Sequence, residues 1–369
     1  MIKVFEPVIT KKDITQVLNS LKKGDISGSY NKTIEKFENN FSEFIGTKHS
    51  ITTSSGTTAL HLAISVLNLP KNSEIILSSC TNIATALAIT HNNCIPVPID
   101  SELNTWNIDV NKIEKSINKK TKAIIVVHFL GNPVNMSKLI YLKKKYNLYL
   151  IEDAAEAHGA TYNKKKIGSF GDLSCFSFYA NKIITTGEGG MVCTNNDMLN
   201  KKLRLYKNLG FVEPRFVHYV QGYNFRLTGI QAALGLEQLK NINKIISNKI
   251  KIAKLYMRLL KKIPGIEFVK NRNNTKHVYW MFGIRITEKF KITKDQLKNF
   301  LAKNQIETRN LFYSMRNQPC LKKILKKNSP ETPNSNILWE QGMYLPSSHN
   351  LKKKEIIKIC NLIKKANFE

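Results

Sequence analysis

Short apolar runs alternate with stretches of helical spacing along the first half of the chain. Runs rich in β-branched and aromatic residues predict strands at 74–77, 94–97, 123–127, 149–151, 175–178 and 191–193. Between several of these runs, apolar residues recur at helical spacing in segments 58–69, 83–91, 110–117 and 137–146. Because strands that alternate with helices usually pair in parallel, the pattern predicts an α/β fold with a mostly parallel sheet sandwiched by helices.

The second half of the chain has longer helical periods. Apolar residues recur at helical spacing across 228–260, which predicts one long connecting helix. The remaining predicted elements are an apolar run at 278–286, a helix at 294–303 and a final helix that ends near Lys365. We therefore expect a large domain over residues 1–250, which includes the N-terminal segment, and a small α+β C-terminal domain over residues 251–369.

Composition adds one extreme value, a formal net charge of +30. Such a charge is typical of nucleic-acid-binding proteins, and steep salt-dependent retention on DNA by a colourless preparation would favour that class. The lysines, however, are spread through the whole chain beside helical apolar positions, and no recognised nucleic-acid-binding motif accompanies them. We expect most of these charges to be solvated and the rest to favour polyanionic small molecules, with no nucleic-acid partner.

Nothing in the sequence indicates a membrane protein, a secreted protein or a metal site. No apolar run reaches the roughly 18 to 20 residues that span a bilayer, and the N-terminus lacks the apolar core of a secretory signal. The six cysteines form no CxxC pair and lie mostly in apolar stretches. We therefore expect a cytoplasmic protein with reduced cysteines, without a membrane partner, a disulfide framework or a bound metal.

Three segments carry candidate chemistry, and the first is Ser54–Thr58, directly before an amphipathic run. Small residues that open a helix leave backbone N–H groups free, and together with the helix dipole these groups bind anions such as phosphate. Taken alone, the segment is better explained as an ordinary N-cap.

The second segment ends in Asp153, after a predicted strand. An acid at the carboxyl end of a parallel strand points into the crevice where open α/β sheets bind ligands. A carboxylate there can hold a protonated pyridine nitrogen, as in pyridoxal phosphate (PLP). Taken alone, Asp153 is equally well explained as the N-cap of a following helix.

The third segment places Lys182 after an aromatic strand and before the glycines of 187–190. Desolvation disfavours the charged amine in such a setting, so the pKa of Lys182 should fall toward the nucleophilic range. Taken alone, the segment also fits a turn lysine before a glycine-rich hairpin.

Together, the order and spacing of these segments resemble the DegT/DnrJ/EryC1/StrS family of sugar aminotransferases, which are fold-type-I PLP enzymes. The matching stretches cover nearly the whole chain and read SSGTTALHLA, PVPIDSELNTWNID, TKAIIVVHFLGNP, IEDAAEAHGA, GSFGDLSCFSFYANKIITTGEGGMVCTN and GYNFRLTGIQAALGLEQL. The block from Ile151 to Asn195 is highly specific. The resemblance implies that PLP is the cofactor and that an amino group moves from glutamate to a nucleotide-linked keto sugar.

The resemblance also implies roles for individual residues. Lys182 takes the position of the Schiff-base lysine, which also shuttles protons, and Asp153 takes that of the partner of the pyridinium nitrogen. The residues that align with the site of the cofactor phosphate are Gly56, Thr57, Thr58 and Ser177. Asn224 aligns with a residue that relatives contribute to the phosphate of the neighbouring subunit, which implies a homodimer with shared active sites.

Four further residues are candidates for contacts to the nucleotide sugar. They are His128, Arg226, Arg309 and Tyr313. Any of them is also explained as a structural residue, and His128, which ends an apolar strand, fits a buried position behind the site equally well.

Two positions depart from the pattern of many relatives. Asn82 stands where many relatives place an aromatic ring over the face of PLP, which puts ring stacking by this residue in doubt. Glu156, expected among the cofactor-binding residues, stands where many relatives have Gln. The Glu version, together with ANKIITTGEGGM and HVYWMFGIRI, resembles the perosamine synthase branch, which aminates C4 of GDP-4-keto-6-deoxymannose with glutamate.

Other functions remain open at this level. UDP- or dTDP-linked 4-keto-6-deoxyglucose is an alternative substrate, and amination at C3 is another outcome, because specificity depends on a few pocket contacts. A sugar dehydratase of the same fold commonly has His in place of the lysine, so Lys182 argues against it. A nicotinamide-dependent reductase is disfavoured because the glycines at 187–190 neither fit GxGxxG nor open a helix after the first strand.

Overall fold

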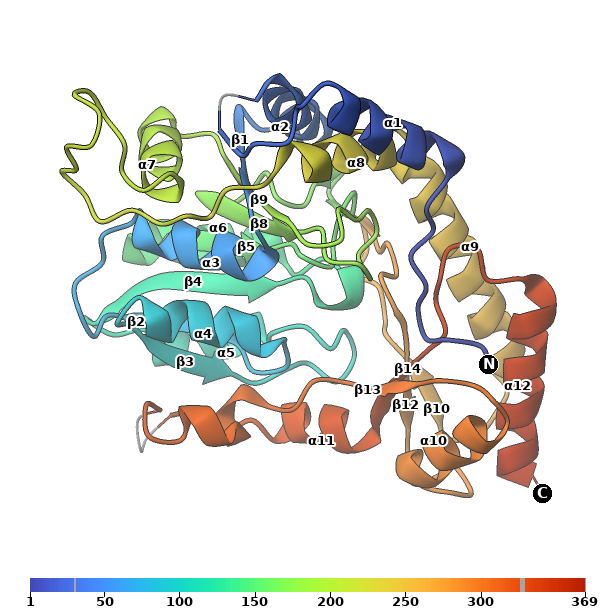
Figure 1. Cartoon of the computed structure of the whole chain (residues 1–369). Coiled ribbons are helices and arrows are strands. Elements are labelled where there is room, and N and C mark those ends of the chain that lie inside the picture. Colours follow the sequence, from blue (N-terminus) through green and yellow to red (C-terminus); the bar gives the residue numbers. More distant parts are fainter. Residues whose placement is uncertain (30, 326–328, 369) are drawn as a thin grey trace.

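The large domain is built around a seven-stranded sheet, with helices on both of its sides (Figure 1). The structure is a computed structural model and describes residues 1–29, 31–325 and 329–368. Across the sheet, the strands follow the order β1-β9-β8-β5-β4-β2-β3. Their bounds are His49–Thr53 (β1), Glu74–Ser78 (β2), Ile95–Ile99 (β3), Thr121–Val127 (β4), Tyr149–Asp153 (β5), Leu173–Ser177 (β8) and Gly190–Thr194 (β9).

Most neighbouring strands in this sheet are parallel. The series β3, β2, β4, β5 and β8 pairs in parallel throughout, and β9 runs antiparallel to both β8 and β1. The predicted α/β class with a mostly parallel sheet is therefore confirmed. The apolar pattern did not predict β1, because the side chains that this strand buries include Ser50, Thr52 and Thr53.

Each face of the sheet carries its own hydrophobic core. Ile124 of β4 belongs to one core and its neighbour Ile125 to the other, since successive residues of a strand point to opposite faces. The first core includes Phe37 and Leu139 from helices on one side, and the second includes Leu60 from the opposite side. The helices of this domain are α1 (Lys11–Lys22), α2 (Lys32–Ile45), α3 (Gly56–Ser65), α4 (Ile83–His91), α5 (Val110–Ile113), α6 (Met136–Tyr146), α7 (Asp197–Lys207) and α8 (Gly229–Lys240).

The predicted single helix across 228–260 is wrong, because the chain forms two helices there, α8 and α9 (Ile242–Leu260). The break falls at Asn241, whose backbone dihedral angles, φ −98° and ψ 0°, are not helical. The Asn241 side chain donates a hydrogen bond to the carbonyl of Glu237, a local bond with which asparagine competes against helix propagation.

A smaller α+β unit follows, as predicted. Its four-stranded antiparallel sheet has the order β10-β12-β14-β13. The strands are β10 (Ile266–Phe268), β12 (Phe282–Ile286), β13 (Arg309–Asn310) and β14 (Gly342–Leu345), and the helices are α10 (Lys294–Lys303), α11 (Pro333–Gln341) and α12 (Lys353–Phe368). The N-terminal segment also reaches this unit, since Ile2 forms a bridge with Ile306.

The apolar run at 278–286 is only partly a strand. Its second half forms β12, but its first half joins the large domain, where the N–H groups of Val278 and Trp280 bond to the carbonyls of Gly131 and Leu130. A further three-stranded sheet, β11-β6-β7, lies nearby and consists of β6 (Thr161–Tyr162), β7 (Lys165–Lys166) and β11 (Thr275–Lys276).

The cysteines are free thiols, and Cys320 is the exposed one among them. Within residues 1–29, 31–325 and 329–368, no group of three or more His, Cys, Asp or Glu side chains is arranged to hold a metal ion. None of the helices in this part of the chain is both long enough and apolar enough to cross a membrane.

Candidate active site

A cavity of about 360 Å³ lies at the carboxyl ends of β5 and β8. Asp153 and Ser177, the last residues of these strands, line it, and so do Trp280, Phe312 and Tyr344 from later in the chain. This edge is where open α/β sheets bind their ligands. All three segments singled out in the sequence meet here.

The first segment supplies the N-terminus of α3. Ser55 is the N-cap, and its side chain and that of Thr58 form a capping box, which occupies the hydroxyl of Thr58. Gly56 and Thr57 line the cavity, and their N–H groups, in the first turn, have no partner within the helix. A Cβ atom on Gly56 would lie 2.7 Å from Cβ of Ser177, so only glycine lets α3 begin this close to β8. The segment is thus an N-cap that also offers free N–H groups to the cavity.

The second segment presents Asp153, which is buried at the end of β5. Its Oδ2 accepts a hydrogen bond from the Thr85 hydroxyl at 2.8 Å, and its Oδ1 accepts one from the Ala155 N–H at 3.2 Å. Burial raises the pKa of this carboxyl, against the opposing effects of these two donors and of the Lys182 charge. The residues that follow form turns rather than a helix, so Asp153 is not a helix N-cap.

The third segment places the Lys182 amine in the cavity, surrounded by protein atoms but open to the hollow itself. Nζ lies 4.1 Å from the centre of the Trp280 ring. Burial lowers the pKa of Lys182, while the charges of Glu156 and Asp153 oppose that effect. The direction is the one expected from the sequence.

Glu156 also lines the cavity, and its side chain is buried. Its Oε2 accepts a hydrogen bond from the Leu130 N–H at 2.7 Å. Burial raises the pKa of Glu156 to about 7, against the lowering effects of the Lys182 charge and this hydrogen bond. The cavity therefore holds two carboxyl groups that burial drives toward their protonated form, beside an amine that burial drives toward its neutral form.

Asn82 lines the cavity and is the N-cap of α4, where its side chain accepts the Ala84 N–H. Asparagine is among the preferred N-cap residues, so capping is a physical reason for Asn at this position. Residue 82 therefore offers no aromatic ring that could stack on a ligand.

The other predicted residues lie outside this cavity. His128 is buried behind it, where Nδ1 accepts the Val134 N–H and Nε2 lies 3.3 Å from Oε2 of Glu152. Tyr313 packs its ring against Trp339, with 5.2 Å between ring centres. Neither side chain lines the cavity.

The remaining three are nearer the surface. Arg226 donates a hydrogen bond to Asn208 and lines a separate hollow. Arg309 pairs with Glu307 and lies opposite Tyr344, a cavity residue, in the pairing of β13 with β14. Asn224 is exposed.

Sequence reasoning missed several residues that line the cavity. They are Thr81, Tyr179, Asn181, Glu188, Trp280, Phe312 and Tyr344. The stretch HVYWMFGIRI was among those that matched the family, and it is the signal that contained Trp280, but no role could be assigned to it from spacing alone.

The residues fit PLP, the cofactor that the resemblance implies. An amine of lowered pKa suits covalent attachment to an aldehyde, a buried carboxyl suits a pyridine nitrogen, and the start of α3 suits a phosphate. The volume lies within the usual range for small-molecule sites. In addition, the side-chain carbonyl of Asn181 is buried without a hydrogen-bond partner among the described residues, as expected of a group that faces a ligand.

Comparisons with known proteins agree with this geometry. The model of the DegT/DnrJ/EryC1/StrS aminotransferase family matches residues 7–364. GDP-perosamine synthase of Vibrio cholerae is 38% identical over 365 residues, which cover 99% of this chain and 98% of the relative. GDP-perosamine synthase of Escherichia coli O157:H7 is 39% identical over 365 residues, which cover 98% of this chain and 97% of the relative.

Among solved structures, the chain resembles Helicobacter pylori PseC, described as an aminotransferase involved in the biosynthesis of pseudoaminic acid. The TM-score is 0.94 at 29% sequence identity, and the alignment covers 99% of both chains. The fold and the arrangement of the two units are thus those of a solved aminotransferase.

Proposed function

The chain belongs to the DegT/DnrJ/EryC1/StrS aminotransferase family, which makes it a PLP-dependent sugar aminotransferase, and we propose that it aminates C4 of GDP-4-keto-6-deoxymannose with glutamate. Glutamate leaves as 2-oxoglutarate, and the C4 ketone becomes the amine of GDP-perosamine. The observation that carries the proposal is the cavity in which Lys182, Asp153 and the start of α3 meet. The likeness to two GDP-perosamine synthases over nearly their whole length supports the choice of substrate.

Bound PLP supplies an electron-withdrawing ring that stabilises negative charge at the Cα atom of the amino donor. In our proposal, Asp153 binds the ring nitrogen, because Thr85 and Ala155 hold its carboxylate at the end of β5. The N–H groups of Gly56 and Thr57 bind the phosphate, with the hydroxyl of Ser177 beside them.

Lys182 has two roles in this proposal. Its amine attaches the cofactor covalently, and once released it takes the proton from Cα of glutamate and later returns a proton to the sugar carbon. Both roles need the neutral amine, and the lowered pKa of Lys182 favours that form at neutral pH. The nearby carboxyl groups limit how far the pKa falls, so the same amine can also hold a proton.

The nucleotide sugar should occupy the part of the cavity next to the smaller unit. Phe312 and Tyr344 offer aromatic surface there, and Arg309, opposite Tyr344 in the strand pairing, is our candidate for binding the diphosphate. We also propose a homodimer in which Asn224 of one subunit reaches the phosphate site of the other. The exposure of Asn224 supports this arrangement.

The test uses purified, yellow holoenzyme with glutamate as the amino donor. GDP-4-keto-6-deoxymannose, UDP-4-keto-6-deoxyglucose and dTDP-4-keto-6-deoxyglucose are compared by kcat/KM, and the position of the new amine is read by NMR of the product. We expect kcat/KM at least about tenfold higher for the GDP sugar, with amination at C4. A higher value for the UDP or dTDP sugar, or an amine at C3, would overturn the substrate, and no amino sugar from any of them would overturn the function.

A further inference from the structure

Trp280 lies against the amine of Lys182, although the two residues are far apart in the sequence. The centre of the indole ring is 4.1 Å from Nζ, and Trp280 is almost completely buried. The face of an indole ring attracts a cation more strongly than other aromatic side chains do. The ring therefore forms a wall of the cavity and interacts directly with the group that the proposed function uses.

Trp280 is fixed by hydrogen bonds at both its backbone and its side chain. Its backbone N–H donates to the carbonyl of Leu130 at 2.9 Å, and its indole N–H donates to the carbonyl of Asn181 at 2.7 Å. Asn181 immediately precedes Lys182, so the second bond restrains the backbone that carries the amine. The buried indole N–H thus finds the partner it needs in the residue next to Lys182.

The turn that holds Trp280 is itself connected to the cavity. Leu130 has a left-handed backbone conformation, φ 52°, which is unusual for leucine and costs free energy unless its surroundings enforce it. Its N–H donates to the carboxylate of Glu156 at 2.7 Å, while its carbonyl accepts from Trp280. One strained turn thus fixes both a carboxyl group and the ring that border the Lys182 amine.

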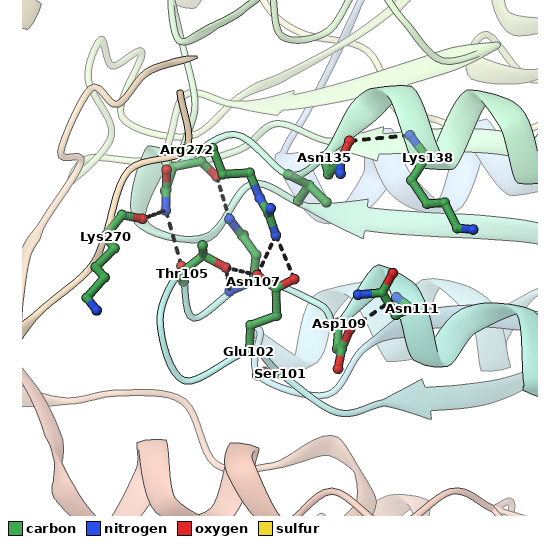
Figure 2. Close-up of polar contacts among 12 residues, drawn as sticks. Ser101, Glu102, Thr105, Asn107, Asp109, Asn111, Asn135, Lys138, Lys270 and Arg272 are labelled. Carbon is green, nitrogen blue, oxygen red and sulfur yellow. Dashed lines mark hydrogen bonds and ion pairs between the residues drawn. The ribbon is translucent and has the colours of Figure 1, made fainter. Parts of the chain in front are cut away.

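A polar cluster that includes Glu102, Thr105, Asn107 and Arg272 (Figure 2) bonds to this turn. Asn107 accepts the Phe129 N–H at 3.0 Å and donates to the carbonyl of Asn132 at 3.0 Å, so it holds the turn at both ends. The Asn132 side chain in turn donates to the carbonyl of Thr105 at 3.2 Å. Figure 2 shows Arg272 reaching from the neighbouring segment to Glu102, with 2.6 Å between Nη2 and Oε1. The support is therefore rigid, as accurate placement of a catalytic group requires.

We propose that Trp280 is a positioning residue for transamination: its indole holds the Lys182 amine in place against the ring face while the amine moves protons. The inference rests on the proposed role of Lys182. The other ionisable groups near the amine or lining the cavity are Asp153, Glu156, His158, Tyr179, Glu188 and Tyr344. Substitution of Trp280 leaves all of these in the chain, so its effect can be separated from theirs.

Two variants test the two contacts. Trp280→Phe keeps an aromatic face but removes the N–H donor, and Trp280→Leu removes the ring as well. We expect kcat to fall about tenfold in Trp280→Phe and further in Trp280→Leu, with KM for both substrates within about twofold of wild type, because the loss is one of geometry at the reacting group. The acidic limb of the pH profile of kcat should move to lower pH by about half a unit in Trp280→Leu, since the ring face favours the protonated amine.

Trp339→Phe is the matched control. Its ring also faces a lysine, with 5.1 Å to Nζ of Lys294, but Trp339 does not line the cavity. Its kcat and pH profile should equal those of wild type. All variants are compared as holoenzymes, and the absorbance of the bound cofactor and the thermal unfolding midpoint show that each is loaded and folded.

The results separate this inference from the proposed function. Wild-type kcat in Trp280→Phe, or an acidic limb that stays in place or moves to higher pH in Trp280→Leu, would overturn the positioning role and leave the function intact. A misfolded Trp280→Leu leaves the decision to kcat and KM of Trp280→Phe. If wild type itself forms no amino sugar, the proposed function fails before the variants are compared.

Discussion

Glu38 and Glu156 are both buried glutamates, yet their surroundings affect them in opposite ways. Burial alone would raise the pKa of Glu38, but Lys207 and Arg204, together with the N–H of Thr52, lower it below its ordinary value. Glu156 has one backbone N–H as its hydrogen-bond partner, and burial raises its pKa to about 7. The two pKa values therefore shift in opposite directions because the charged and hydrogen-bonding partners of the two glutamates differ, although both side chains are buried.

The contrast separates structural charges from functional ones. Lys207 of the Glu38 cluster has Nζ 3.0 Å from Oε1 of Glu38, so both charges are compensated within the chain. The Lys182 amine in the cavity has an aromatic face beside it and no ion pair among the described residues. Burying charge without full compensation costs free energy, and a protein tolerates that cost where a ligand supplies the missing partner.

Among the substitutions that test this contrast, replacement of Lys182 should have the largest effect. Lys182→Ala should lower amino-sugar formation by about 10³-fold or more, because it removes both the point of attachment and the proton carrier. The thermal unfolding midpoint of the cofactor-free variant should not fall, since a buried amine without an ion pair is lost. Lys201→Ala, on the exposed face of α7, is the control and should keep wild-type turnover. Turnover by Lys182→Ala within tenfold of wild type would contradict its role.

Neutralising Glu38 tests whether its ion pairs with Arg204 and Lys207 stabilise the fold. Glu38→Gln keeps the shape of the side chain but leaves Arg204 and the nearly buried Lys207 without their counter-charge. We expect the free energy of unfolding to fall by about 3 kcal/mol, the lower end for breaking a buried ion pair, since Arg204 is half exposed. Chemical denaturation measures this value, and kcat of the folded enzyme should be unchanged.

Glu43→Gln, an exposed change on the same helix, serves as the control for Glu38→Gln and should shift the unfolding free energy by less than about 0.5 kcal/mol. Equal stability of the two variants would show that the ion pairs of Glu38 with Arg204 and Lys207 do not stabilise the fold.

The smallest effect is expected for Glu156→Gln, and it is a change in how protein stability depends on pH. The ordinary pKa of 4.5 is raised to about 7 in the folded chain, so between these values the folded state holds a proton that the unfolded state has lost. The contribution of Glu156 to stability is therefore full below pH 4.5 and is lost as the pH rises through 7. Glutamine does not titrate, so the stability of cofactor-free Glu156→Gln relative to wild type should rise between pH 5 and 7, by at most about 1 kcal/mol per pH unit. If the stability difference between Glu156→Gln and wild type is constant or falls with pH, the pKa of Glu156 is not raised, and the contrast with Glu38 is lost.

The sequence predicted those parts of the fold and site that depend on local pattern. The buried runs that became β4, β5 and β8, and the position of Asp153 at a strand end, follow from spacing along the chain. Strand direction does not, because a local apolar pattern is the same in β9, which runs against its neighbours, as in a parallel strand.

Contacts between distant segments were beyond prediction for the same reason. Trp280 reaches Lys182 only because a left-handed turn at Leu130 receives its backbone, and no spacing rule encodes that meeting. Conversely, His128 and Tyr313 had suitable chemistry for a ligand but pack behind or beside the cavity, where Glu152 and Trp339 are their neighbours.

Helix α9 belongs to two of the hydrophobic cores of the chain. Its first turns place Ile245 in the core of the large domain, its later turns place Tyr256 in the core of the smaller unit, and Ile250, between them, packs against both. In Figure 1, α9 is itself continuous and runs from the end of α8 toward α12. The boundary expected at residue 250 falls within this continuous helix, so we expect the two halves to unfold as one cooperative unit. Heat should melt them in a single transition, and neither half expressed separately would retain an intact core.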